Sequence, residues 1–230
     1  MATLETRRTP EYAASPRRSA PRKDSREELL RAAKALFARE GFEGVSVKEI
    51  AEKAGVNVGL IAYYFGGKAG MYKECLTENG EQRLAATRRV LALANSLLEF
   101  ELRLKLFSEE IVNSHLRDPE LAAIVHRECE RGGSQLPEVA DIFRTTYLLV
   151  FKTLQLFIED GISKKFLRQD LDAEIATLFF FGQLIHAVRL DTANSKYFGK
   201  TIANPEYRER YLSQLVEIFI LGLAQKGASS

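Results

Sequence analysis

The chain has 230 residues, 46% of them hydrophobic, which suits one or two domains with a substantial core. Its 33 Lys and Arg nearly balance 31 Asp and Glu, which excludes a uniformly basic coat for nucleic acid. The balance differs along the chain: residues 1–68 hold 13 basic and 9 acidic residues, whereas residues 69–230 hold 20 and 22. This bias modestly favours phosphate contact near the N-terminus.

Composition also limits the location and the cofactors that we expect. Cys75 and Cys129 form no CxxC pair, so neither a disulfide framework nor a zinc ribbon is predicted. We expect no metal and no cofactor. No apolar run approaches the ~20 residues of a membrane span, and the N-terminus lacks the apolar stretch of a signal peptide. We therefore expect a soluble cytoplasmic protein associated with the nucleoid.

Residues 1–23 predict a disordered basic tail, because Pro10, Pro16 and Pro21 occur among scattered polar residues without a helical period. The basic residues of this tail are Arg7, Arg8, Arg17, Arg18, Arg22 and Lys23. Two interpretations stay open: a solvated tail, or an arm that adds phosphate or minor-groove contacts.

A first amphipathic helix is expected from about Ser25 to Gly41. Ser25 and Glu28 have the spacing of a capping box, in which each residue hydrogen-bonds a backbone N–H of the other. The apolar residues that share one helical face are Leu29, Ala33, Leu36 and Phe37.

Two short helices joined by a tight turn are expected next. Ser46 and Glu49 repeat the capping box at the start of the second helix. Gly55 can adopt the left-handed conformation that ends this helix, and Asn57 can cap the third. Such a pair is the helix-turn-helix pattern, which places its second helix in a DNA groove.

The third helix is expected to divide its side chains between two faces. The residues expected to turn inward are Val58, Ile61, Ala62 and Phe65. Leu60, Tyr63 and Tyr64 would then lie outward. A leucine and two tyrosines on one short exposed face suit contact with a partner better than contact with water.

Beyond Lys68 the pattern is helical to the end, without strand alternation or an internal repeat, so the expected fold class is all-α. Helices are expected from 68 to the mid-90s, over 97–116, from 119, and over 137–160, 173–190 and 206–224, with a polar loop before the last. The predicted division is a tail at 1–23, a helix-turn-helix DNA-binding domain at 24–75, and a helical regulatory and dimerisation domain at 76–230.

The three-helix unit resembles the DNA-binding domain of the TetR family of transcriptional regulators over about residues 24–75. The matching residues are Leu29–Phe37, Gly41-Phe42, Val45-Ser46-Val47, Ile50-Ala51, Ala54-Gly55-Val56, Gly59, Ile61, Tyr63-Tyr64-Phe65 and Lys68. The resemblance implies a ligand-responsive regulator, usually a repressor, that binds an inverted-repeat operator as a homodimer. The rest of the chain is similar to the family only in length and layout.

By position, the resemblance implies that eight residues contact double-stranded DNA: Lys48, Asn57, Val58, Gly59, Leu60, Tyr63, Tyr64 and Lys68. Lys48 would reach a guanine edge or a phosphate, and Leu60 a thymine methyl group. The two tyrosines and the last lysine would contact phosphate. Ala62 stands where the family commonly has tyrosine, and Tyr64 where histidine is frequent, so the family's base preferences do not transfer.

The last two helices are expected to form a four-helix bundle with a second copy, as the resemblance implies. The apolar positions predicted for this interface are Leu178, Phe181, Ile185, Leu212, Leu215, Val216, Phe219 and Leu223. Gly182 and Gly222 would allow close approach.

The C-terminal half is rich in phenylalanine, which favours either an ordinary core or an apolar cavity for a small-molecule effector. The residues predicted to bind such an effector are His126, Tyr147, Phe151 and Gln183. The polar run from His126 to Glu130 is either a charged helix end or part of that pocket. Pro119 separates His115 from His126, so helical spacing does not place the two histidines on one face.

No catalytic residues are predicted, because HExxH, paired CxxC, GxSxG and phosphate-loop patterns are all missing from the sequence. The alternative to a regulator is an all-helical enzyme or scaffold whose N-terminal unit binds something other than DNA.

Overall fold

The computed structural model describes residues 23–134 and 136–223, which form helices and connecting turns with no β-strand. The predicted all-α fold is therefore confirmed over this part of the chain. The prediction of a disordered basic tail concerns residues 1–23, which lie almost wholly outside the described residues.

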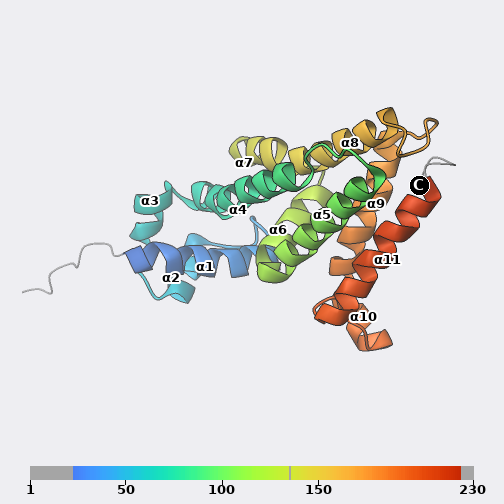
Figure 1. The fold of residues 1–230 in the computed structure, drawn as a ribbon. Coiled ribbons are helices and arrows are strands. Elements are labelled where there is room, and N and C mark those ends of the chain that lie inside the picture. Colours follow the sequence, from blue (N-terminus) through green and yellow to red (C-terminus); the bar gives the residue numbers. More distant parts are fainter. Residues whose placement is uncertain (1–22, 135, 224–230) are drawn as a thin grey trace, which may run out of the picture.

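The N-terminal unit contains α1 (Lys23–Glu40), α2 (Val47–Ala54) and α3 (Gly59–Phe65) at one end of the molecule (Figure 1). From this unit α4 (Lys68–Val90) runs into the remainder. The following helices are α5 (Leu97–Arg117), α6 (Pro119–Glu130), α7 (Pro137–Ile142), a π-helical segment (Phe143–Tyr147), α8 (Leu148–Ser163), α9 (Ala173–Arg189), α10 (Asp191–Phe198) and α11 (Pro205–Leu223).

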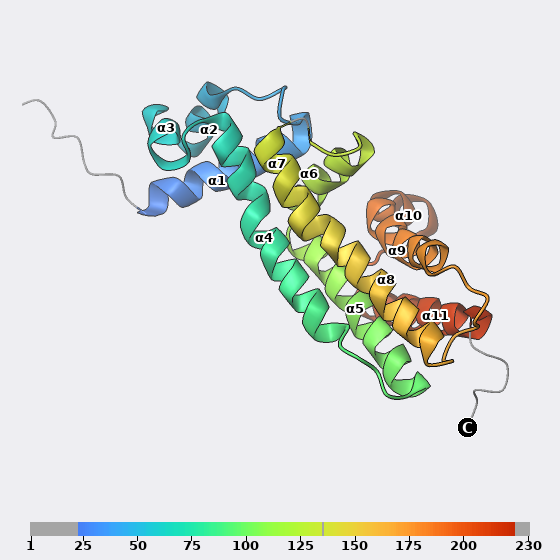
Figure 2. The same ribbon diagram turned by 90° about the horizontal axis from the view of Figure 1, so that it is seen from above.

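Two hydrophobic clusters hold these helices together. One joins α5, α8, α9 and α11 with the end of α4, and Figure 2 shows α4, α5 and α8 lying side by side. The other contains the inner faces of α1 to α3 and the start of α4, but also Leu121 and Ile124 of α6 and Val139 of α7. The N-terminal unit thus shares its core with helices of the C-terminal half.

The first helix begins earlier than its capping pattern predicted. It starts at or before Lys23, so Ser25 lies inside the helix and does not cap it.

The expected polar loop before the last helix contains α10, a short helix that the sequence analysis missed. Asp191 holds the segment: its carboxylate accepts hydrogen bonds from the Thr201 hydroxyl at 2.7 Å and the Ile202 N–H at 2.5 Å.

Within the described residues no single helix has the length and apolarity to cross a membrane; by those two criteria only α9 and α10 taken together qualify, with a 62° bend between them.

The prediction for the outer faces of α9 and α11 was wrong in part. Leu212, Val216 and Phe219 are buried in the chain's own core and are not available to a second copy. The reason is the helical phase: these three residues share one face of α11, and that face packs on α5. The apolar residues left exposed on the two helices are Ile175, Leu178, Phe179, Ile218 and Leu221.

A glycine allows close packing in the larger cluster. The Phe100 ring stacks on Phe157 with centroids 4.5 Å apart, and Gly161 lies directly against it. A Cβ atom added at Gly161 would stand 2.5 Å from Phe100 Cε2.

We expect Gly161→Ala to lower the free energy of unfolding. Overpacking a buried site costs about 1–3 kcal/mol, which exceeds the gain in helix propensity of at most about 1 kcal/mol. Urea unfolding followed by far-UV circular dichroism measures the change. A variant as stable as the parent would mean that the Phe100 ring has room to move.

Candidate nucleic-acid interface

The turn between α2 and α3 forms as its sequence predicts. The Ser46 hydroxyl accepts the Glu49 N–H at 3.2 Å, and the Glu49 carboxylate accepts the Ser46 N–H at 2.8 Å. The Ser46 hydroxyl also donates to this carboxylate at 2.7 Å, and the hydrogen bonds from the Ser46 hydroxyl and N–H lower the pKa of the Glu49 carboxyl group. Gly55 ends α2 with φ of 66°, a left-handed conformation that favours glycine.

The third helix is fixed at both ends. The Asn57 side chain accepts the Gly59 N–H at 2.8 Å, so Asn57 caps the helix from two residues before its first residue. At the other end Gly66 and Gly67 adopt φ of 71° and 126°. Because the second value requires glycine, the sharp turn into α4 depends on that residue.

The side chains of α3 divide between its faces differently from the prediction. Ile61 is buried as expected, but Leu60 and Tyr64 also pack partly against the core. Val58, predicted to turn inward, is 47% exposed, and Ala62 is exposed as well. The exposed face of α3 therefore consists of Val58, Gly59, Ala62 and Tyr63. Packing against α1 and α4 sets this rotation, and a seven-residue helix carries too few apolar positions to define it.

Three predicted contact residues, on α2, α3 and α4, carry polar groups. Tyr63 is 70% exposed, and its ring meets that of Tyr64 edge to face at 5.1 Å. Lys48 on α2 has an 81% exposed side chain with a loose 3.7 Å ion pair to Glu52. Lys68 is the first residue of α4, and its ammonium group lies 4.3 Å from the centre of the Phe42 ring.

Arg127 of α6 connects the N-terminal unit to the C-terminal half. Its guanidinium donates to the carbonyl oxygens of Phe37 at 2.7 Å, Ala38 at 3.0 Å and Arg39 at 3.2 Å. These carbonyls belong to the last turn of α1, where C=O groups begin to lack intrahelical partners. The Phe37 carbonyl also accepts the Gly41 N–H at 2.9 Å. The positive charge also complements the helix dipole at this end.

Two further polar contacts strengthen the same junction. Lys34 of α1 pairs with Asp118, the residue before α6, at 2.5 Å. The Tyr72 hydroxyl on α4 donates to the buried carboxylate of Glu128 at 2.6 Å. Burial raises the pKa of Tyr72, which therefore remains a donor at neutral pH. Sequence analysis noted the polar run around Arg127 but had no signal that it reaches α1.

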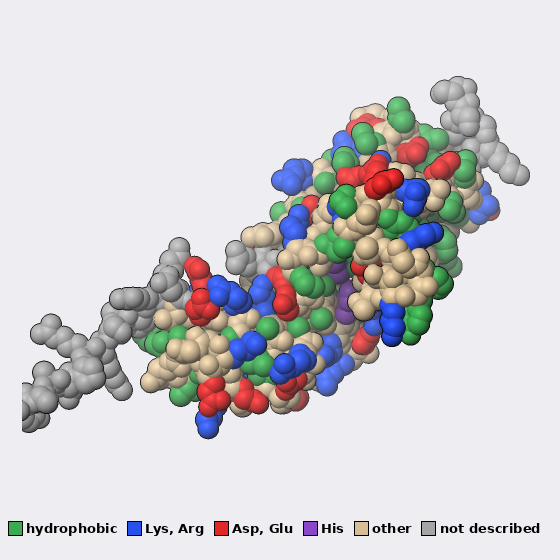
Figure 3. Space-filling view, turned by 90° about the horizontal axis from the view of Figure 1, so that it is seen from below, with side chains coloured by type: hydrophobic (Ala, Val, Ile, Leu, Met, Phe, Trp, Pro, Cys, Tyr) green, Lys and Arg blue, Asp and Glu red, His purple; other side chains and the backbone are tan. Residues whose placement is uncertain are grey.

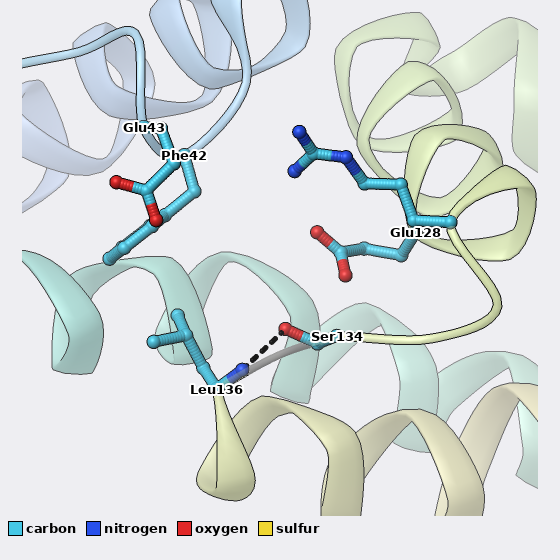
Figure 4. A pocket seen from close by; sticks show the side chains of 6 residues that line it. Phe42, Glu43, Glu128, Ser134 and Leu136 are labelled. Atoms are coloured by element: carbon cyan, nitrogen blue, oxygen red, sulfur yellow. Dashed lines mark hydrogen bonds between the residues drawn. The ribbon is translucent and has the colours of Figure 1, made fainter.

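A cavity of about 410 Å³ lies beside this junction. Figure 4 shows Phe42 and Glu43 of the N-terminal unit facing Glu128, Ser134 and Leu136 of the C-terminal half, with the Leu136 N–H donating to the Ser134 hydroxyl. The cavity thus lies between the unit that carries α3 and the helices that hold it.

A second cavity, of about 450 Å³, lies between α6 and the end of α9, and we refer to it as the histidine cavity. Its polar lining includes His115, His126, Glu130, Arg189 and Thr192. Burial and nearby arginines lower the pKa of His115 to about 3 and that of His126 to about 4, so both rings are neutral at pH 7. Figure 3 shows histidine side chains in a recess of the surface.

The four residues predicted to bind an effector do not come together. Only His126 lines the histidine cavity. Tyr147 belongs to the core of the N-terminal unit, where its hydroxyl donates to the Leu76 carbonyl at 2.9 Å. Phe151 packs edge to face on Phe181, and the Gln183 carbonyl accepts the Tyr211 hydroxyl. Much of the phenylalanine surplus is core, since Phe100, Phe107 and Phe180 are fully buried.

Comparison with known proteins identifies relatives of the chain. Residues 29–75 match the family model described as bacterial regulatory proteins, tetR family. The chain is 31% identical over 140 residues to the probable HTH-type transcriptional regulator YttP of Bacillus subtilis, a match covering 60% of this chain and 64% of that protein. It is 26% identical over 155 residues to the HTH-type transcriptional repressor KstR2 of Mycolicibacterium smegmatis, covering 67% and 73%. The YttP match therefore spans less than two thirds of that relative.

Solved structures share the fold. The ketosteroid transcriptional regulator KstR2 of Mycobacterium tuberculosis aligns with a TM-score of 0.69 at 23% identity, covering 89% of this chain and 97% of that one. The fatty acid degradation regulator FadR of Bacillus halodurans aligns with a TM-score of 0.63 at 21% identity, covering 86% and 98%. These likenesses concern architecture. The relatives named here are transcriptional regulators and not enzymes, in agreement with the sequence analysis.

We expect Arg127→Met to destabilise the protein by about 1.5–3 kcal/mol, because the variant keeps much of the apolar stem but loses charged hydrogen bonds to α1. Thermal unfolding measures this change. Arg131→Met is the matched control: Arg131 is exposed at the end of the same helix, so its replacement should shift stability little. Equal effects of both substitutions would contradict a specific role for Arg127.

Proposed function

Because this chain belongs to the TetR family of bacterial transcriptional regulators, we propose that it is a repressor that binds an inverted-repeat operator as a homodimer and releases it when a small molecule binds. One observation carries the proposal: α3, fixed by Asn57 at one end and by two glycines at the other, presents an exposed face at the end of the molecule (Figure 1).

The exposed face of α3 has small, apolar side chains at its start and also includes the Tyr63 ring. Val58, Gly59 and Ala62 allow the backbone to approach base edges closely, and their apolar atoms suit the methyl group of thymine. This assigns to Val58 and Ala62 the contact that the resemblance implied for the half-buried Leu60. Lys48 extends from α2 and supplies a donor for a guanine edge.

Phosphate contacts come from the turn between α3 and α4. A helix start presents free N–H groups and the positive end of the helix dipole, both of which favour an anion. Gly67 keeps the approach open, since no atom stands within 4 Å of an added Cβ there. Lys68 and Tyr63 add a charge and a hydroxyl donor at the same place. These contacts give affinity without base discrimination.

A second copy is needed because one seven-residue helix contacts few base pairs, and a two-fold axis doubles the contacts over two half-sites. We assign the interface to the exposed apolar face of α9 and α11, defined by Ile175, Leu178, Phe179, Ile218 and Leu221. Gly182 and Gly222 have open space around them, which permits close helix contact. This replaces Leu212, Val216 and Phe219 of the sequence prediction.

An effector would alter DNA binding by acting on α6. The histidine cavity is lined by His126 and Arg127, and Arg127 holds the last turn of α1. A ligand that moves α6 therefore moves the base on which α2 and α3 rest. Such a ligand must prefer the arrangement that does not bind DNA, and a tenfold loss of affinity requires about 1.4 kcal/mol of preference. The polar lining favours a more polar effector than the phenylalanine content had predicted.

We expect Lys48→Ala and Lys68→Ala to weaken DNA binding differently. The duplexes are an operator recovered from bound genomic fragments and a scrambled version, both measured by fluorescence anisotropy at two salt concentrations. Lys48→Ala should cost about 1–3 kcal/mol per half-site on the operator alone, because it removes a base contact. Lys68→Ala should weaken both duplexes and reduce the salt slope by about one per half-site.

Lys152→Ala is the control, since Lys152 is exposed on α8 away from α3, and it should leave both affinities unchanged. Absence of any sequence-dependent binding by the parent protein would refute the proposed function. Equal losses on both duplexes for Lys48→Ala would refute only its assignment to a base.

We expect Leu178→Glu to produce monomers of about half the parent's mass in sedimentation equilibrium, because symmetry places two buried carboxylates in the interface. Leu102→Glu is the control, since Leu102 is also an exposed leucine but lies on α5. A parent protein that sediments at 25.9 kDa at micromolar concentration would exclude the dimer.

A further inference from the structure

His115, near the end of α5, and His126 of α6 are eleven residues apart in the chain and meet where the two helices join. The Nε2 atoms of His115 and His126 lie 3.3 Å apart, and their ring centroids are 5.2 Å apart. Because the centroids are farther apart than the nitrogens, both Nε2 atoms lie on the facing sides of the rings. The Nδ1–H of His115 donates to the Ile111 carbonyl at 2.7 Å, which leaves the lone pair of its neutral ring on Nε2.

We propose that His115 and His126 bind a divalent transition-metal ion between cobalt and zinc in the first-row series, in the histidine cavity. Two nitrogens at about 2.0–2.1 Å from one tetrahedral ion lie about 3.3 Å from each other, the separation found here. The hydrogen bond from the other ring nitrogen of His115 to a carbonyl is the outer contact that usually orients a metal-binding histidine. Neutral imidazole is a preferred ligand for these ions.

Glu130 supplies the third ligand. It follows His126 by one helical turn, so both side chains project from the same side of α6, and both line the histidine cavity. No group of three ligating side chains is present among the described residues, and the Glu130 carboxylate is paired with Arg189 of α9. Glu130 is half exposed, and in the proposed site its carboxylate leaves Arg189 to bind the metal. The cavity volume of about 450 Å³ leaves space for a water molecule as the fourth ligand.

Metal binding would change the contacts of α6. It would link α6 to α5 through two histidines and release α6 from the ion pair with α9. Arg127, the residue after His126, holds the end of α1. The metal would therefore alter DNA affinity, a consequence that rests on the proposed function, whereas the metal site itself does not.

The site is tested by titrating the full-length protein with Co²⁺ and recording visible absorption, followed by competition with Zn²⁺. The chain has only three histidines, so each can be replaced singly. His126→Gln should weaken binding at least about tenfold, and His115→Gln should do the same if circular dichroism shows that it folds. Glu130→Gln should weaken binding less. His186→Gln is the control: His186 is exposed on α9, and its loss should change nothing.

Three outcomes overturn the site: the parent protein shows no saturable Co²⁺ or Zn²⁺ binding, binding survives His126→Gln, or binding is lost with His186→Gln. DNA affinity is then measured with and without Zn²⁺. If Zn²⁺ binds through His126 but leaves DNA affinity unchanged, the site stands and the coupling through α6 is refuted. If no duplex is bound with or without Zn²⁺, the proposed function fails independently of the site.

Discussion

The position of the N-terminal unit depends on the contact between the last turn of α1 and one guanidinium from α6. Three carbonyl oxygens at that end of α1 accept hydrogen bonds from Arg127, and the Lys34–Asp118 ion pair and the Tyr72–Glu128 hydrogen bond lie close by. Since α2 and α3 pack on α1 and α4, their placement relative to the body follows from these bonds. The same helix, α6, lines both described cavities, so the cavities and the N-terminal unit share one support.

Packing extends this coupling beyond the polar contacts. The hydrophobic cluster of the N-terminal unit includes residues of α6 and α7, and α4 contributes to both clusters. The boundary expected near residue 75 falls within α4, about a third of the way along a continuous helix. A displacement of α4 at either end therefore reaches the other end without a flexible linker to absorb it.

Sequence alone predicted the turn between α2 and α3, which local chemistry determines. The capping box at Ser46, the left-handed Gly55 and the cap at Asn57 depend on neighbours within three residues, and all three form. The predicted rotation of α3 about its axis was wrong, because helices distant in sequence partly bury Leu60 and Tyr64. Arg127 and the His115–His126 pair were missed as contacts for the same reason: their partners lie across helix junctions, where spacing along the chain carries no information.

The shared core also limits how this regulator can be recombined with others. Residues 29–75 match the family model, yet this segment alone leaves Met71, Tyr72 and Cys75, which belong to the cluster shared with α6 and α7, without those helices. A chimera that transfers only this segment to another regulator's body would have to rebuild that surface and find a new partner for the end of α1. A unit that keeps this core intact extends to α7, so exchanging a shorter segment would disturb packing that point substitutions on the exposed face of α3 leave in place.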